Sequence, residues 1–167
     1  TLASFLTPFM GSSVNVALPA IGRDYALTAL GVSWVASAFL LSSAITLVPL
    51  GRLADIYGRK MIFTAGAILL CVSSFGCLWA PGQTVFIALR AVQGIGGAMI
   101  FSTGTAMLVA AYPPSHRGRI LGINIASVYI GLTIGPFIGG LLTQHLGWKT
   151  IFVFSALLAA GLAACAL

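Results

Sequence analysis

Charged residues are scarce in this sequence. Only 6% of the 167 residues are Asp, Glu, Lys or Arg, while 59% are hydrophobic. About a quarter of the residues of a soluble domain are charged. The chain cannot cover itself with a water-soluble surface, so lipid must surround most of it. A soluble globular domain is therefore excluded.

Side chains for catalysis or metal binding are also few. The two acids, Asp24 and Asp55, and the two histidines, His116 and His145, all fall in expected connections. No residues have the spacing of metal ligands. The three cysteines all lie in apolar runs and are expected to be small buried hydrophobic residues: Cys71, Cys77 and Cys165. A membrane-embedded enzyme would need His, Asp or Glu clustered within the spans. We therefore expect no enzyme, no metal site and no cofactor.

The basic residues do not form a patch. The formal net charge is +6, but the charges sit in short clusters between apolar runs, as in membrane loops. No nucleic-acid partner is expected. No basic residue precedes the first apolar stretch, so no secretory signal is predicted. The chain begins with Thr1 and stops at Leu167 inside an apolar run, so we expect a piece of a longer protein.

Six apolar stretches are each long enough to cross a bilayer, which takes about 20 residues. They cover roughly residues 2–21, 31–50, 61–79, 84–109, 120–142 and 150–167. A β-barrel would need alternating strands, and these runs are continuously apolar. The sequence predicts an all-α membrane fold, with residues 1–167 forming one six-transmembrane-helix domain surrounded by membrane lipid.

The basic residues also predict an orientation. The second connection holds Arg52, Arg59 and Lys60, and the fourth holds Arg117 and Arg119. The first and fifth connections hold one basic residue each, Arg23 and Lys149. By the positive-inside rule the second and fourth connections, and the N-terminus, are cytoplasmic. Trp34, Trp79 and Trp148 then all fall at the outer interface, where an indole is favoured.

A short sequence match within the chain supports an internal repeat. Residues 51–63 (GRLADIYGRKMIF) align with residues 140–152 (GLLTQHLGWKTIF) and agree at six positions. One copy joins the second and third spans inside, and the other joins the fifth and sixth outside. We therefore predict a three-plus-three inverted repeat, as transporter halves contain.

The second connection carries the first motif, Gly51-Arg-Leu-Ala-Asp55-Ile-Tyr-Gly58-Arg59-Lys60. Glycines at both ends would let the backbone turn tightly between two helices. Asp55 is spaced to pair with Arg59 or to accept from a helix N-terminus. The alternative is a basic cytoplasmic loop with one stray acid.

The fourth span carries the second motif, Arg90-Ala-Val-Gln93-Gly-Ile-Gly-Gly. Arg90 lies about six residues, or roughly 9 Å, inside the span. A charge at mid-bilayer costs at least about 2.5–3.5 kcal/mol, so Arg90 should face the bundle interior on a solute or proton path. Gln93, nearly one turn on, extends this polar stripe. The alternative is that Arg90 snorkels to the interface.

The fifth span carries the third motif, with glycines at positions i, i+4 and i+8 and a final pair: Gly131, Gly135, Gly139 and Gly140. Such glycines form a flat face against which another helix can pack closely. Pro136 removes one backbone hydrogen bond and bends the helix. The face would suit a sliding element, or equally static close packing.

Polar residues also occur in the first span, between Pro8 and Pro19. Asn15 follows Ser12 and Ser13 there. Asn15 is a candidate for lining a solute cavity. The more modest alternative is a hydrogen bond to a neighbouring helix.

These motifs resemble those of the major facilitator superfamily, over essentially the whole chain. Residues 51–60 resemble its signature loop, with Ile56 where a basic residue is usual, and residues 90–97 resemble a helix-four motif whose arginine is implicated in proton coupling. Residues 131–140 match its antiporter motif, and residues 12–22 resemble helix one of the fourteen-span drug–proton antiporters. That branch commonly has Asp where this chain has Met10, which leaves no acid within the spans.

The resemblance implies the N-terminal half of a transporter in the cell membrane. The implied activity is proton-coupled export of small hydrophobic or drug-like molecules by alternating access, with the absent C-terminal half as partner and the proton gradient as energy source. Arg90 would tune coupling, Asp55 with Arg59 would latch the cytoplasmic side, and the glycine face would let the halves move. A nutrient symporter or uniporter, and a non-transporting scaffold or sensor, remain alternatives.

Overall fold

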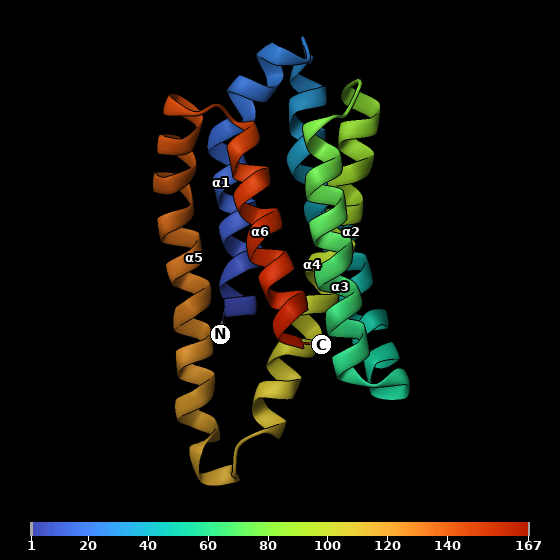
Figure 1. Ribbon diagram of the computed structural model, residues 1–167, viewed down its shortest axis with the longest axis vertical. Coiled ribbons are helices and arrows are strands. Elements are labelled where there is room, and N and C mark those ends of the chain that lie inside the picture. Colours follow the sequence, from blue (N-terminus) through green and yellow to red (C-terminus); the bar gives the residue numbers. More distant parts are fainter. Residues whose placement is uncertain (1, 167) are drawn as a thin grey trace.

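The computed structural model describes residues 2–166, and this part of the chain is helical apart from its short connections (Figure 1). Six α-helices and one turn of 3-10 helix, η1, follow one another along the chain. Their order is α1 Leu2–Asp24, α2 Ala29–Tyr57, α3 Arg59–Leu78, α4 Gln83–Ala110, η1 Pro114–His116, α5 Arg117–His145 and α6 Lys149–Ala166.

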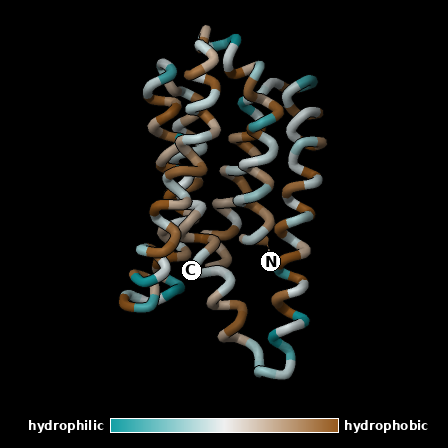
Figure 2. The backbone as a smooth tube through the Cα atoms, turned by 180° about the vertical axis from the view of Figure 1, so that it is seen from behind, coloured by the Kyte–Doolittle hydropathy of each residue, from teal (hydrophilic) through white to brown (hydrophobic). Residues whose placement is uncertain are grey.

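All six α-helices are long and apolar enough to cross a membrane. Because lipid offers no hydrogen-bond partners, a spanning segment must satisfy its backbone internally, and a helix does so. The most hydrophilic stretches lie at the two ends of the bundle (Figure 2). The predicted six-helix membrane fold is confirmed.

The helices run further than the predicted spans, most of all at the second connection. Residues 51–60 are expected to be a loop, but α2 continues to Tyr57 and α3 begins at Arg59. Gly58 alone makes the turn, with a φ of 99° that favours glycine. Gly51 lies inside α2, so the expected turn at both glycines is wrong. The predicted spans cover only the apolar residues of each helix, whereas the helix itself continues through the polar residues beyond them.

The turns gather at two ends of the bundle (Figure 1). The α1–α2, α3–α4 and α5–α6 turns lie together at what we call the Trp148 end. The α2–α3 and α4–α5 connections lie at the opposite, Asp55 end, beyond which α4 and α5 extend furthest. All helices are therefore antiparallel to their neighbours in sequence.

The helix pairing follows the predicted repeat. The two most extensive helix contacts join α1 with α5 and α2 with α4. If α1, α2 and α3 are exchanged with α4, α5 and α6 in order, the α1–α5 pair becomes the α4–α2 pair, and the reverse also holds. The closely packed pair α3 and α6 is also kept by this exchange. These pairs follow the inverted repeat, whereas the almost equally extensive α3–α4 contact has no such counterpart, because α1 and α6 contact each other much less.

Four rings pack together near the Trp148 end; we call Tyr25, Phe86, Trp148 and Phe152 the aromatic cluster. Their paired ring centroids lie 5.4–6.0 Å apart. Trp148 is only 4% exposed, and its indole Nε1 donates to Asp24 Oδ2 at 2.6 Å. Trp34 and Trp79 are exposed, as predicted for interface residues. Trp148 lies at the same end of the bundle, but its neighbours bury it.

The cluster ties three turns together. The Tyr25 hydroxyl donates to the Ala80 carbonyl at 3.0 Å, so the α1–α2 turn is held to the α3–α4 turn. The Trp148 bond to Asp24 holds the α5–α6 turn to the end of α1. Burial, with smaller contributions from Cys77 and Asp24, raises the pKa of Tyr25, which keeps this donor protonated.

Candidate functional site

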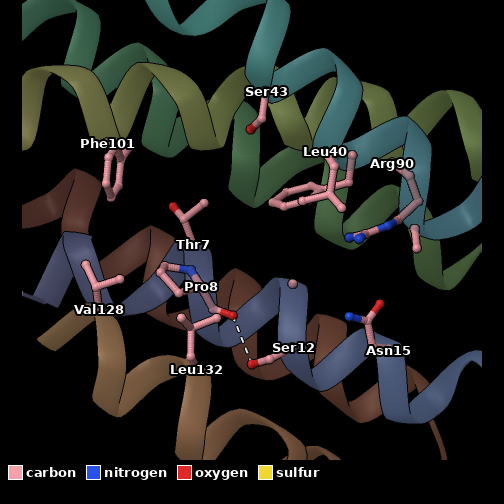
Figure 3. Close-up of a pocket in the computed structure, with 13 residues that line it drawn as sticks. Thr7, Pro8, Ser12, Asn15, Leu40, Ser43, Arg90, Phe101, Val128 and Leu132 are labelled. Carbon is pink, nitrogen blue, oxygen red and sulfur yellow. Dashed lines mark hydrogen bonds between the residues drawn. The ribbon is translucent and has the colours of Figure 1, made fainter.

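A cavity of about 380 Å³ opens between α1, α2, α4 and α5 (Figure 3). Its size is in the range of small-molecule sites. Its lining is mostly apolar with a few polar side chains, and comprises Thr7, Pro8, Gly11, Ser12, Asn15, Ala36, Phe39, Leu40, Ser43, Arg90, Phe101, Val128 and Leu132. Arg90 is the one charged residue among these.

Arg90 points into the bundle. The residue is 1% exposed, so it does not snorkel out of this domain. Its Nε donates to the Val35 carbonyl at 3.1 Å and its Nη1 to Gln93 Oε1 at 2.7 Å. The guanidinium carbon lies 4.6 Å from the centroid of the Phe39 ring. Neutral carbonyls and a π-face therefore replace the carboxylate that usually accompanies a buried guanidinium.

Gln93 lies behind Arg90. Its Nε2 donates to Ser74 Oγ at 3.0 Å, and Ser74 donates in turn to the Leu70 carbonyl. Gln93 is fully buried against α3 and is not among the cavity-lining residues. Its place on a solute or proton path stays a prediction. Its side-chain oxygen holds Nη1 of the Arg90 guanidinium.

Asn15 is exposed and lines the cavity. Figure 3 shows its amide on α1 at the same end of the cavity as the guanidinium, with Phe101 and Val128 at the other end. The cavity interpretation of Asn15 therefore has the support of geometry, and within residues 2–166 no hydrogen bond ties its side chain to a neighbouring helix. Ser12, by contrast, donates to the Pro8 carbonyl at 2.9 Å.

Several lining residues carry no signal in the sequence. Thr7, Phe39, Ser43 and Phe101 lie in largely apolar spans, where nothing in the sequence marks the face toward a cavity. Met10, where the antiporter branch commonly has Asp, is fully buried in the apolar core and is not among the cavity-lining residues. The missing acid would therefore not have lined this cavity.

The motif at the Asp55 end forms an ion pair. Arg59 Nη2 lies 2.9 Å from Asp55 Oδ1, and Arg59 Nη1 donates to the Ala106 carbonyl on α4 at 3.3 Å. The pairing expected from the spacing is present and links the α2–α3 turn to α4. Lys60 follows on α3 and is exposed, as is Ile56 on α2.

The glycine face of α5 packs on α1. A Cβ added at Gly131 would lie 2.6 Å from the Phe5 carbonyl, and one at Gly139 would lie 2.8 Å from Ser13 Cα. At Gly135 it would collide with Ser12 Oγ, and Ser13 Oγ donates to the Gly135 carbonyl at 2.9 Å.

The predicted flat face exists, but another helix of the same domain covers it. This contact favours static close packing at these three glycines, and the expectation that the face lets the halves move stays a prediction. Pro136 is exposed and Gly140 half-buried, so both lie off this contact.

Six helices that are long and apolar enough to cross a membrane surround a solute-sized cavity with a buried cation at its edge, an arrangement that fits a membrane transport protein. Within residues 2–166, no three His, Cys, Asp or Glu side chains come together as a metal site would require. The family model of the Major Facilitator Superfamily matches residues 1–167. The chain belongs to this family.

Relatives and a solved structure agree with this assignment. The multidrug resistance protein Stp of Mycobacterium tuberculosis (strain CDC 1551 / Oshkosh) is 39% identical over 140 residues, which cover 83% of this chain and 26% of that protein. The riboflavin transporter RibZ of Clostridioides difficile (strain 630) is 31% identical over 151 residues, which cover 90% of this chain and 33% of that protein. The chain thus spans about a third or less of these relatives.

The fold comparison is with a crystal structure of a bacterial homologue of the human lysosomal transporter Spinster, in an inward-facing and unoccupied conformation. The TM-score is 0.83 at 19% sequence identity, over 99% of this chain and 40% of that one. This likeness shows that the chain has the fold of a six-helix portion of such a transporter.

Proposed function

We propose that residues 1–167 are the N-terminal half of a proton-coupled exporter of small hydrophobic or drug-like molecules. The observation that carries this proposal is the cavity with Arg90 at its edge. A charge is retained inside a span only against a cost of about 2.5–3.5 kcal/mol or more, so an intramembrane arginine marks a functional path.

The proposed mechanism is alternating access. The solute binds in the cavity, between this half and a C-terminal half that covers the exposed apolar faces of α2 and α5. The aromatic cluster and the α1–α5 contact keep this half rigid while it rocks. Asp55 and Arg59 act as the latch at the Asp55 end. The acid that carries the coupled proton belongs to the other half, because Asp24 and Asp55 both lie at helix ends.

The orientation we propose places the Asp55 end and the N-terminus in the cytoplasm of a plasma-membrane protein. The positive-inside rule supports it, since the second and fourth connections carry most basic residues.

Export is favoured by relatives whose names describe resistance, such as Stp and the methylenomycin A resistance protein of Bacillus subtilis (strain 168). A second candidate is a facilitator for a metabolite, working as a symporter or uniporter. It is favoured by the similarity to a riboflavin transporter. A non-transporting scaffold or sensor would have no use for a cation beside a cavity.

The test is flux of lipophilic dyes and riboflavin into inverted vesicles that contain the full-length protein, with and without an imposed pH gradient. We expect gradient-driven accumulation that a protonophore abolishes, and at least about a tenfold loss of flux in Arg90→Ala. Arg119→Ala, which removes an exposed arginine of α5, is the matched control. Flux that only equilibrates would support a uniporter, and unchanged flux in Arg90→Ala would overturn the role of Arg90.

A further inference from the structure

The cavity contains a cation and no anion. Arg90 is the one charged residue of the lining, and the only two acids of the chain are engaged elsewhere. Asp24 accepts from Trp148, and Asp55 pairs with Arg59. The electrostatic potential of this half of the cavity is therefore positive.

The guanidinium also retains donor capacity. Its two hydrogen bonds, to the Val35 carbonyl and to Gln93 Oε1, use one N–H of Nε and one of Nη1. The other N–H groups meet no acceptor within residues 2–166, and a guanidinium donates through all of them in a planar fork. Both acceptors in use are neutral, so the positive charge is not compensated. An anionic oxygen would satisfy the free donors and the charge together.

A second polar group in the same cavity has no partner. The Thr7 Oγ1 atom is buried and makes no hydrogen bond in the described part of the chain. Such an atom costs about 1–3 kcal/mol unless something bonds to it. Thr7 and Asn15 both lie on α1 and line the cavity, so α1 offers two polar contacts to an occupant.

Apart from Ser12 and Ser43, whose hydroxyls donate to backbone carbonyls, the rest of the lining is apolar or aromatic. Phe39 lies beneath the guanidinium, and Leu40 and Phe101 continue the wall (Figure 3). A flat hydrophobic body could pack on this surface while a charged group at its edge reaches Arg90. The cavity thus combines one anion-binding corner with an apolar wall.

We propose that this cavity selects small aromatic anions over cations of the same shape. The proposal rests on the transport function above and names the substrate class. The anionic oxygens bind the free N–H groups of Arg90, the ring packs on Phe39, and Thr7 bonds to a polar substituent. A cation would meet the guanidinium with like charge, and this half supplies no carboxylate to offset it.

The experiment is equilibrium binding of three naphthalene probes to the full-length protein in detergent. The probes are naphthalene-2-carboxylate, naphthalene-2-methanol and naphthalene-2-methylammonium, which share the naphthalene ring system and differ in charge. We expect the carboxylate to bind roughly tenfold to a hundredfold more tightly than the ammonium, as for a charge-assisted hydrogen bond, with the alcohol between them.

Three variants and one control show whether Arg90 is the cause. Asn15→Asp is isosteric and exposed, and it places a carboxylate in the cavity, so the carboxylate's preference should vanish or reverse. Arg90→Lys keeps the charge but loses the fork, and should retain part of the preference. Arg90→Gln should lose it, and Arg119→Gln, outside the cavity, should keep it in full. Size-exclusion profiles identify any variant that fails to fold.

The proposal is overturned if the ammonium binds as well as the carboxylate, if no probe binds, or if Asn15→Asp leaves the order of affinities unchanged. The dye-flux assay separates this from the proposed function. Export of cationic dyes together with any of these results would refute the charge selection and leave transport standing. Absence of all flux would refute transport itself.

Discussion

The two sides of Arg90 are built differently. Toward the Trp148 end lies the aromatic cluster, in which the rings contact one another and hydrogen bonds join three turns. Toward the middle of the bundle lies the cavity, where Thr7 Oγ1 and part of the guanidinium have no partner among the described residues. The same helices, α1 and α4, run through both regions.

This difference separates stability from function. A region whose polar groups are all satisfied and whose rings interlock contributes rigidity. A region with unsatisfied polar groups contributes little to stability and is available to a ligand. Substitutions in the aromatic cluster should therefore lower stability, and substitutions in the cavity should change binding.

The largest expected effect is that of Trp148→Ala. The change removes a buried ring and leaves Asp24 without its indole donor. Large-to-small aromatic substitutions cost about 3–5 kcal/mol in protein cores. We expect a clearly lower Tm of the full-length protein in detergent, with probe affinity of the folded fraction retained.

Trp79→Ala is the control, since Trp79 is 75% exposed and lies at the same end. An equal loss of Tm in both variants would show that the aromatic cluster is not a special source of stability.

A smaller effect is expected from Gly135→Ala. The added methyl group would collide with Ser12 Oγ and press on the Phe9 carbonyl. Overpacking of this kind costs about 1–3 kcal/mol. Thermal unfolding of the full-length protein measures it.

The matched control is Gly140→Ala on the same helix, where the nearest atom would be at an ordinary 3.7 Å. If both variants unfold at the wild-type temperature, the contact between α1 and α5 is looser than the structure indicates.

The smallest effect on stability is expected from Asp55→Asn. The side chains of Arg59 and Asp55 are 41% and 61% exposed, and such i,i+4 pairs contribute about 0.3–0.5 kcal/mol. We expect a Tm within about 1 °C of wild type, because the free-energy change is so small for a protein of this size. Transport should fall more than Tm if the pair is a latch, and a flux equal to wild type would remove that role.

The sequence predicted the helices well, but it did not predict which residues of each helix face the core, the cavity or the lipid. Six apolar runs define six helices, and the cost of a buried charge correctly placed Arg90 inside the bundle. Lipid-facing and core-facing residues are both apolar, however, so no pattern distinguished Trp148 in a cluster from Trp34 at an exposed position. For the same reason Phe39 and Phe101 could not be recognised as cavity residues.

Partners of polar residues were also beyond sequence reasoning. The i, i+3 spacing predicted that Gln93 lies beside Arg90. It did not predict that Gln93 lies on the side of Arg90 away from the cavity. The glycine spacing in residues 131–139 predicted a close helix contact, yet did not reveal that α1 occupies it. Both depend on how distant segments pack.

Accessibility of Asn15→Cys tests most directly whether the cavity is a solute path. The measurement is labelling by a membrane-impermeant maleimide added to either side of membranes that contain the full-length protein without Cys71, Cys77 and Cys165. Alternating access predicts labelling from both sides, while Tyr57→Cys, at the Asp55 end, should be labelled from one side only. Labelling of Asn15→Cys from one side or from neither would contradict a cavity that opens to both faces of the membrane.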